Sequence, residues 1–293
     1  MNISRFRRIP HGIAWRARRA TGAIELRRFR PRLAYDPDGV VVLLSPHWDD
    51  AVFNCWSLLT SDANVSVVNV FGGVPPPGPA RRWDKICGAR EAQARAHERI
   101  AEDAEALTHT GRQALNLALL DAEYRAPDAD PSLDELDEAL ADVIPAASAV
   151  YAPASLGTNA DHRLVRRYAR AVHRHGIPAR LYADLPYCTV HGWPHWVDGS
   201  DLDPHRDVDV FWETFLADLP ELPNLRSAEV VHLAPERAEA KLAAMRAYRT
   251  QFPALDGGVG RLADPAVHSF EVFWSLDRSG LSTSSAPPAP RTG

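Results

Sequence analysis

The chain has 293 residues and a formal net charge of −5, which suits one large α/β domain and gives no overall basic charge for nucleic-acid binding. Its three cysteines are widely spaced and form no CxxC pair, which argues against a disulfide framework or a cysteine zinc cluster and favours a reducing, cytoplasmic compartment. No apolar run approaches the roughly 20 residues that a membrane-spanning helix needs.

Both ends of the chain differ from the middle. Residues 1–35 hold ten Arg against a single acid, Glu25, without the long apolar core of a secretory signal. We interpret them as a basic N-terminal extension that folds against the acidic domain or joins a homo-oligomer contact. Binding of a membrane surface or of nucleic acid by this arm is the alternative. Residues 279–293 are rich in Ser, Pro and Ala and predict a disordered tail.

The remaining residues, 36–278, alternate between strand and helix patterns. Apolar runs predict strands at 40–44, 65–71, 114–120, 149–155 and 179–187. Amphipathic patterns with capping residues predict helices at 84–109, 133–144, 162–175 and 235–252. This alternation predicts a Rossmann-like, three-layer α/β/α sandwich with a mostly parallel sheet.

The first predicted strand runs directly into a polar turn, in the sequence LSPHWDDAVFNCW. Ligands of open α/β sheets bind at the carboxyl ends of the strands, so ionisable side chains placed there are candidates for function. If a helix begins at this turn, His47 and Asp50 are three residues apart and can point to one centre, while Asp49 points elsewhere. The alternative is a structural one, in which an Asp caps the helix.

The strand at 149–155 also ends in polar residues, Gly157-Thr158-Asn159-Ala160-Asp161-His162. A parallel sheet can bring two strand ends side by side, and a site with two His and one Asp would then form. Three such ligands with one open position are typical of catalytic zinc. Asp49 would remain as a carboxylate beside the site, where a general base belongs.

The motifs SPHWDD and NADH, about 110 residues apart, resemble the PIG-L/LmbE-like zinc N-deacetylases. Weaker resemblances at residues 97–107, 120–125, 182–187 and 241–252 extend this likeness over roughly residues 38–275. The resemblance implies that His47, Asp50 and His162 bind zinc and that Asp49 is the catalytic base. It also implies an LmbE-like fold.

Three positions depart from the family pattern. Trp48 replaces the usual Pro, and we expect its larger side chain to line the substrate pocket. Ala51 replaces a Glu. Asn159 stands where the family has a His that polarises the substrate carbonyl, so we expect Asn159 to stabilise the oxyanion. An amide cannot donate a proton as an acid, which leaves His191 as a candidate for that step.

Loops supply the other candidate residues. Arg82, Trp83 and Asp84 follow the Pro-rich loop after the strand at 65–71, on the predicted edge of the site, and are candidate substrate contacts. His191 lies in the aromatic sequence CTVHGWPHW. That sequence fits either a packed surface loop or a lid that holds a sugar or an acyl chain.

Together these features predict a bacterial, zinc-dependent hydrolase of secondary metabolism that removes an N-acyl group, expected to be acetyl, from a small molecule. An amino sugar, a thiol precursor and a natural-product intermediate all remain open as substrates. One alternative keeps the metal and changes the reaction, to another amidase or a non-hydrolytic step. The other is a non-catalytic binding protein that uses the basic arm. We expect no nucleic-acid partner.

Overall fold

A seven-stranded sheet forms the centre of the protein, in a computed structural model that describes residues 39–126, 128–185, 192–200, 207–219, 221–222, 224–257 and 260–277. The strands lie in the order β3-β2-β1-β4-β5-β7-β6. All neighbours from β3 to β5 pair in parallel, and β7 runs antiparallel to both of its neighbours. The strands are β1 (Val40–Ser45), β2 (Asn64–Asn69), β3 (Ala114–Asn116), β4 (Ala147–Pro153), β5 (Ala179–Tyr182), β6 (Glu229–His232) and β7 (Phe270–Ser275). The predicted mostly parallel sheet is confirmed.

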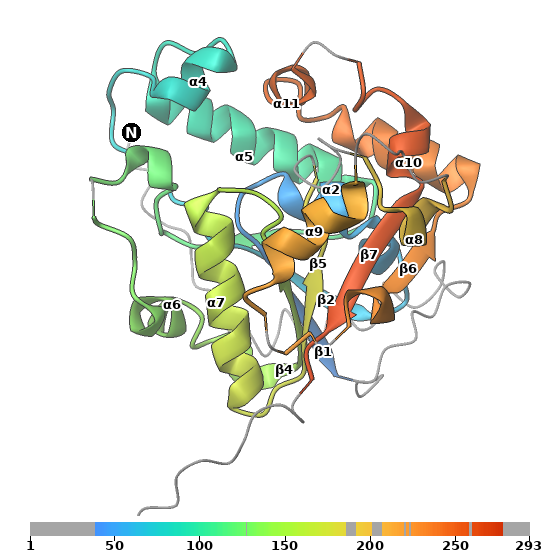
Figure 1. Ribbon diagram of the computed structural model, residues 1–293. Coiled ribbons are helices and arrows are strands. Elements are labelled where there is room, and N and C mark those ends of the chain that lie inside the picture. The colour runs from blue at the N-terminus through green and yellow to red at the C-terminus, as the bar shows by residue number, and fades with distance from the viewer. Residues whose placement is uncertain are drawn as a thin grey trace, which may run out of the picture.

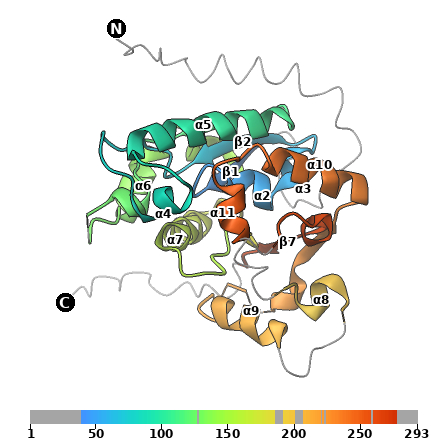
Figure 2. The ribbon, with the colours of Figure 1, turned by 90° about the horizontal axis from the view of Figure 1, so that it is seen from above.

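Helices cover both faces of this sheet (Figure 1). Seen from above, α5 and α7 lie on opposite sides of the strands (Figure 2). α10 packs against α2 and α5, and α6 packs against α7. The helices are α2 (Asp50–Asn54), α3 (Trp56–Leu59), α4 (Arg82–Ile86), α5 (Ala92–Thr108), α6 (Leu133–Ala139), α7 (Ala160–Arg174), α8 (His195–Asp198), α9 (Val208–Leu216), α10 (Pro235–Met245) and α11 (Phe252–Asp256). β1 is buried at all six positions because both faces are covered, which explains its unbroken apolar sequence.

Several predicted elements are shorter than expected. The helix predicted at 84–109 is two helices, because the chain turns at Gly88 with a φ of 82° and Glu91 then caps α5 by accepting from two backbone N–H groups. The helix predicted at 235–252 ends at Met245, and α11 begins separately with Pro253 in its first turn. The strand predicted at 114–120 pairs only over Ala114–Asn116. Four further elements were not predicted: β6, β7, α8 and α9.

The order of the strands creates the position for a site. β1 and β4 are neighbours, yet the chain leaves β1 towards β2 on one side and leaves β4 towards β5 on the other. The loops after these two strands therefore diverge, and open α/β sheets bind ligands in the crevice that this leaves. None of the helices in the described ranges has the length and apolar composition required to cross a membrane.

The basic extension at 1–35, the tail at 279–293 and His191 lie outside the described residues. The predictions made for them stay predictions.

Candidate metal centre

Three side chains from two strand ends meet in the crevice. His47 follows β1, Asp50 opens α2, and His162 lies in the first turn of α7 after β4. Asp50 Oδ2 is 3.4 Å from His47 Nδ1 and 3.3 Å from His162 Nε2. Zinc ligands about 2.1 Å from the ion lie about 3.4 Å apart when they are tetrahedral. The three donor atoms therefore have the chemistry and the spacing to hold such an ion.

Each imidazole is held from behind by a buried carboxylate. His47 Nε2 is 3.1 Å from Asp161 Oδ2, and His162 Nδ1 is 2.9 Å from Asp184 Oδ2. Both carboxylates are fully buried. Metal-binding histidines in proteins commonly use their second ring nitrogen in this way, which fixes the tautomer and the ring orientation. This arrangement leaves His47 Nδ1 and His162 Nε2 as the atoms that face Asp50.

A second group of potential ligands, His47, Asp121 and Asp161, shares one histidine with the first. Two guanidinium groups flank it. Arg125 is 2.6 Å from Asp161 Oδ1, and Arg99 is 3.9 Å from Asp121 Oδ2. These positive charges oppose a further cation. The first group is therefore the better candidate for a metal ion, and Asp161 supports His47.

The pKa values of the centre show how strongly its charges interact. Burial alone would lower the pKa of His162, but Asp50 and Asp184 raise it to about 9. Burial likewise opposes charge on His47, whose pKa Asp121, Asp161 and Asp50 hold well above the usual value. Burial disfavours the charge of Asp50, yet the two histidines lower its pKa. A metal ion at this position would replace the protons on the imidazoles and meet an ionised carboxylate.

Asp49 lies beside the three ligands without joining them. It precedes α2, is 8% exposed and makes no side-chain capping hydrogen bond. Burial and the neighbouring charge of Asp50 raise its pKa, while Arg99 and His47 lower it. The purely structural interpretation, in which Asp49 caps the helix with its side chain, finds no support. A carboxylate beside the cluster is available to accept a proton.

Asn159 precedes α7 as its N-cap. Its side-chain oxygen accepts from the backbone N–H groups of Asp161, at 2.9 Å, and His162, at 3.4 Å. This contact ties Asn159 to the helix turn that carries a metal ligand. It also makes the amide NH₂ the end of the side chain that can donate to a substrate.

The four residues expected at the substrate take different positions. Trp48 is 1% exposed, so its ring packs beneath the centre instead of lining an open pocket. Arg82 is exposed at the start of α4. Trp83 is half-buried and donates from Nε1 to Gln251. Asp84 is fully buried and accepts from the hydroxyl of Tyr124 at 2.7 Å, which is a structural contact.

Five charged residues around the centre were not predicted from the sequence: Arg99, Asp121, Arg125, Asp161 and Asp184. Asp161 was part of the quoted motif and Asp184 of the strand at 179–187, so a carboxylate partner for each histidine could have been sought there. Arg99 lies within the amphipathic pattern of α5, where a buried arginine leaves no signal in a single sequence. Asp121 and Arg125 flank the turn after β3.

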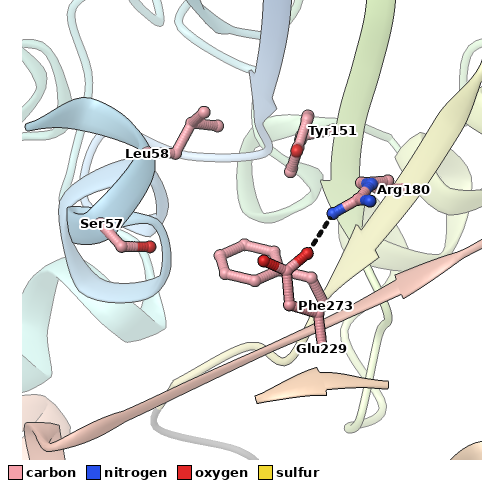
Figure 3. A pocket seen from close by; sticks show the side chains of 6 residues that line it. All are labelled: Ser57, Leu58, Tyr151, Arg180, Glu229 and Phe273. Atoms are coloured by element: carbon pink, nitrogen blue, oxygen red, sulfur yellow. Dashed lines mark hydrogen bonds and ion pairs between the residues drawn. The ribbon is translucent and has the colours of Figure 1, made fainter. Parts of the chain in front are cut away.

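A small pocket lies elsewhere on the sheet, between α3 and the strands β4 to β7 (Figure 3). Its charges are paired, since Arg180 Nη1 is 2.5 Å from Glu229 Oε2. Arg180 and Glu229 lie at the beginnings of β5 and β6, away from the carboxyl ends that carry the metal ligands. This pocket shares no residue with the metal centre.

The chain is similar to known proteins in sequence and in fold. Residues 42–173 match the PIG-L family, described as GlcNAc-PI de-N-acetylase. The chain is 31% identical to the 2'-N-acetylparomamine deacetylase of Streptomyces fradiae over 183 residues, which are 53% of this chain and 63% of that enzyme. The match thus spans less than two thirds of the relative's length.

Two solved structures have a similar fold over most of the chain. A deacetylase of the teicoplanin biosynthetic pathway, solved as a triple mutant, is 27% identical with a TM-score of 0.61, covering 82% of this chain and 98% of that one. The A40926 pseudoaglycone deacetylase Dbv21 is 25% identical with a TM-score of 0.61, covering 83% and 98%. Residues 42–173 are therefore similar to the PIG-L family, and the chain has a fold similar to that of these two deacetylases over most of its length.

Proposed function

We propose that the protein is a zinc-dependent hydrolase that removes an N-acetyl group from an amino sugar of a natural product, in the cytoplasm of a bacterium. The observation that carries this proposal is the buried set His47, Asp50 and His162, in which a carboxylate anchors each imidazole. The relatives support the substrate class, because they are named as deacetylases of 2'-N-acetylparomamine, of the teicoplanin biosynthetic pathway and of the A40926 pseudoaglycone.

His47, Asp50 and His162 would hold the ion. A bound zinc ion supplies a Lewis acid that polarises the amide carbonyl and acidifies water. Asp49 takes the proton of the attacking water, because it is the carboxylate that lies beside the ligands without being one of them. The water oxygen adds to the carbonyl carbon, the carbon–nitrogen bond breaks, and the nitrogen takes up a proton. The products are acetate and the free amine.

Arg99 and Asp121 fit the sugar part of the substrate. Arg99 is 3% exposed, and its guanidinium makes no hydrogen bond with any other described residue. A buried cation with unused donors close to a carboxylate suits the hydroxyl groups of a sugar, which both donate and accept hydrogen bonds.

Asn159 stabilises the negative charge that develops on the carbonyl oxygen. Its side-chain oxygen caps α7, which directs the NH₂ group away from the helix. Asn159→Ala should lower kcat by roughly 10-fold to 10³-fold and change KM little, since one oxyanion donor contributes about 2.7–4 kcal/mol or somewhat less where a metal shares the charge. Steady-state kinetics measure the two constants. A raised KM with unchanged kcat would make Asn159 a contact to the ground-state substrate.

Acetate and amine release from a panel of N-acetylated amino sugars tests the function. The panel includes 2'-N-acetylparomamine and N-acetylglucosaminyl glycopeptides, assayed with the zinc-loaded protein, after chelation and after zinc is restored. We expect acetate and amine to be released in equal amounts. This activity should be lost after chelation and should return when zinc is restored. Release of a longer acid would indicate a different amidase. A protein that binds no metal and releases no amine would favour the binding-protein alternative.

A further inference from the structure

Trp48 separates the ligand His47 from Asp49, yet its side chain does not reach the surface, being 1% exposed. From its contacts we infer that Trp48 is a positioning residue, which holds the Arg99 guanidinium at the metal centre and so sets how tightly the substrate's hydroxyl groups bind. This inference rests on the proposed function and assigns a role to the residue that replaces the Pro usual in the family.

The indole ring is fixed in one orientation by hydrogen bonds. Trp48 Nε1 donates to Asn116 Oδ1 at 3.1 Å, at the end of β3. The same oxygen accepts from Asn69 Nδ2 at 2.8 Å, and this amide also donates to Asp103 Oδ2 at 2.7 Å. Groups from β2, β3 and α5 thus hold the ring. Because this hydrogen-bond network joins three elements, the ring cannot easily turn unless the strand ends move.

The face of the fixed ring carries Arg99. Its guanidinium carbon is 4.8 Å from the centroid of the Trp48 ring, within the range of a cation–π contact. Arg99 Nη1 is 3.9 Å from Asp121 Oδ2, beyond hydrogen-bonding distance, and Arg99 Nε has no hydrogen-bond partner among the described residues. The ring and the charges of Asp49 and Asp121 therefore hold the guanidinium, which keeps hydrogen-bond donors that the described residues do not use. A Pro at position 48 has no aromatic face and could not hold Arg99 in this way.

Four variants test the role with 2'-N-acetylparomamine as the probe: Trp48→Leu, Trp48→Phe, Arg99→Met and Asn116→Leu. Trp48→Leu and Arg99→Met should each raise KM by about 10-fold, the order expected for a desolvated cation–π contact. Trp48→Leu keeps the Arg99 charge near Asp49 and should leave kcat nearly unchanged. Trp48→Phe keeps an aromatic face and should retain most of the affinity. Asn116→Leu releases the ring from a position remote from the ligands and should raise KM by a smaller factor.

The double variant Trp48→Leu/Arg99→Met distinguishes positioning from two separate contacts. Its KM should equal that of Arg99→Met, because the ring acts only through the guanidinium. A KM increase in the double variant equal to the product of the two single increases would overturn the inference. If Trp48→Leu instead loses zinc and kcat, Asn116→Leu decides. An unchanged KM in Asn116→Leu would then overturn the inference as well.

The contact can also be tested without any substrate. Urea denaturation of the wild type, both single variants and the double variant gives the coupling between Trp48 and Arg99 in the free protein. A favourable coupling is expected, and additive effects would overturn the inference. Absence of acetate release by the wild type would overturn the proposed function alone, since this coupling does not depend on turnover.

Discussion

Two buried polar clusters lie at the starts of the short helices α2 and α3. They differ in how completely other protein groups satisfy their charges and hydrogen-bond donors. In the first, at the start of α2, the adjacent carboxylates Asp49 and Asp50 are both buried, and the nearby Arg99 makes no hydrogen bond with the described chain. In the second, at the start of α3, Lys241 Nζ is 2.8 Å from Glu271 Oε1, and both side chains are at most 1% exposed.

The second cluster is complete in itself. Glu271 also accepts from the backbone N–H groups of Trp56, at 2.7 Å, and Ser57, at 2.9 Å, so it joins β7 and α10 to the start of α3. Burying charge is costly unless the groups are paired and hydrogen-bonded, and here they are. The first cluster keeps like charges together and leaves donors unused. Incomplete satisfaction of this kind is what distinguishes a site that awaits a metal and a substrate from a structural ion pair.

Loss of a metal ligand should give the largest effect. His162→Ala removes one of three ligands, so the purified protein should fall from about one zinc per chain to near none and lose its deacetylase activity. Metal analysis together with acetate release measures both. His47→Ala should behave in the same way. Full zinc occupancy in both variants would remove the first cluster from consideration as the metal centre.

Asp184→Asn supplies a graded control for that experiment. It keeps all three ligands and changes only the group behind His162 Nδ1. Metal affinity should fall by about 10-fold to 100-fold, while saturating zinc restores most of the activity.

Removal of the base should give the next effect. Asp49→Asn keeps the shape of the side chain but cannot accept a proton, so kcat should fall by roughly 10²–10⁴-fold at unchanged zinc content. Kinetics at saturating substrate and metal analysis provide the check. Should this variant lose zinc while Asp50→Asn retains it, the roles of ligand and base would be exchanged.

A break in the second cluster should affect stability and leave the chemistry unchanged. Lys241→Met leaves the carboxylate of Glu271 buried without its cation, which should lower the free energy of unfolding by about 3–5 kcal/mol. The folded fraction should keep the wild-type kcat. The double variant Lys241→Met/Glu271→Gln removes both charges and keeps one of the two acceptor oxygens that Trp56 and Ser57 use, so it should recover part of the loss in urea denaturation. A reduced kcat in folded Lys241→Met would contradict the structural assignment.

The smallest expected effect is a change of stability with pH, which comes from His268 near the second cluster. Burial and the charge of Lys241 lower the pKa of His268 to about 4, below its ordinary 6.5. Between these values the unfolded chain binds the proton more strongly, so His268 stabilises the fold fully above pH 6.5 and loses this contribution as the pH falls towards 4. This loss lowers the free energy of unfolding by about 1–3 kcal/mol.

His268→Gln isolates this contribution, since an amide can still donate to the carbonyl of Leu262, which His268 Nε2 contacts at 2.8 Å. The difference in unfolding free energy between wild type and variant should shrink from pH 7.5 to pH 5. A difference that is constant over this range would show that His268 does not titrate within the fold.

The sequence alone determined the elements that carry the metal ligands. Val40–Ser45 is apolar throughout because it is buried on both faces, and β-branched residues make it a strand whatever surrounds it. The three-residue spacing of His47 and Asp50 likewise follows from the local helix. The alternation of strands and helices was sufficient to predict the sheet, because local periodicity reports which faces are buried.

The tertiary structure decided everything that depends on contacts between distant segments. Asp161 and Asp184 reach the centre only because β4 lies between β1 and β5. Arg99 reaches it because α5 is held beside the end of β2 and over Trp48. Trp48 appeared from its position to face the substrate, and the fold instead places it under Arg99. β6 is a strand of four residues at the sheet edge, and β7 lies between β5 and β6. Neither was predicted, because both are stabilised by antiparallel pairing with distant segments, which leaves no period in the sequence.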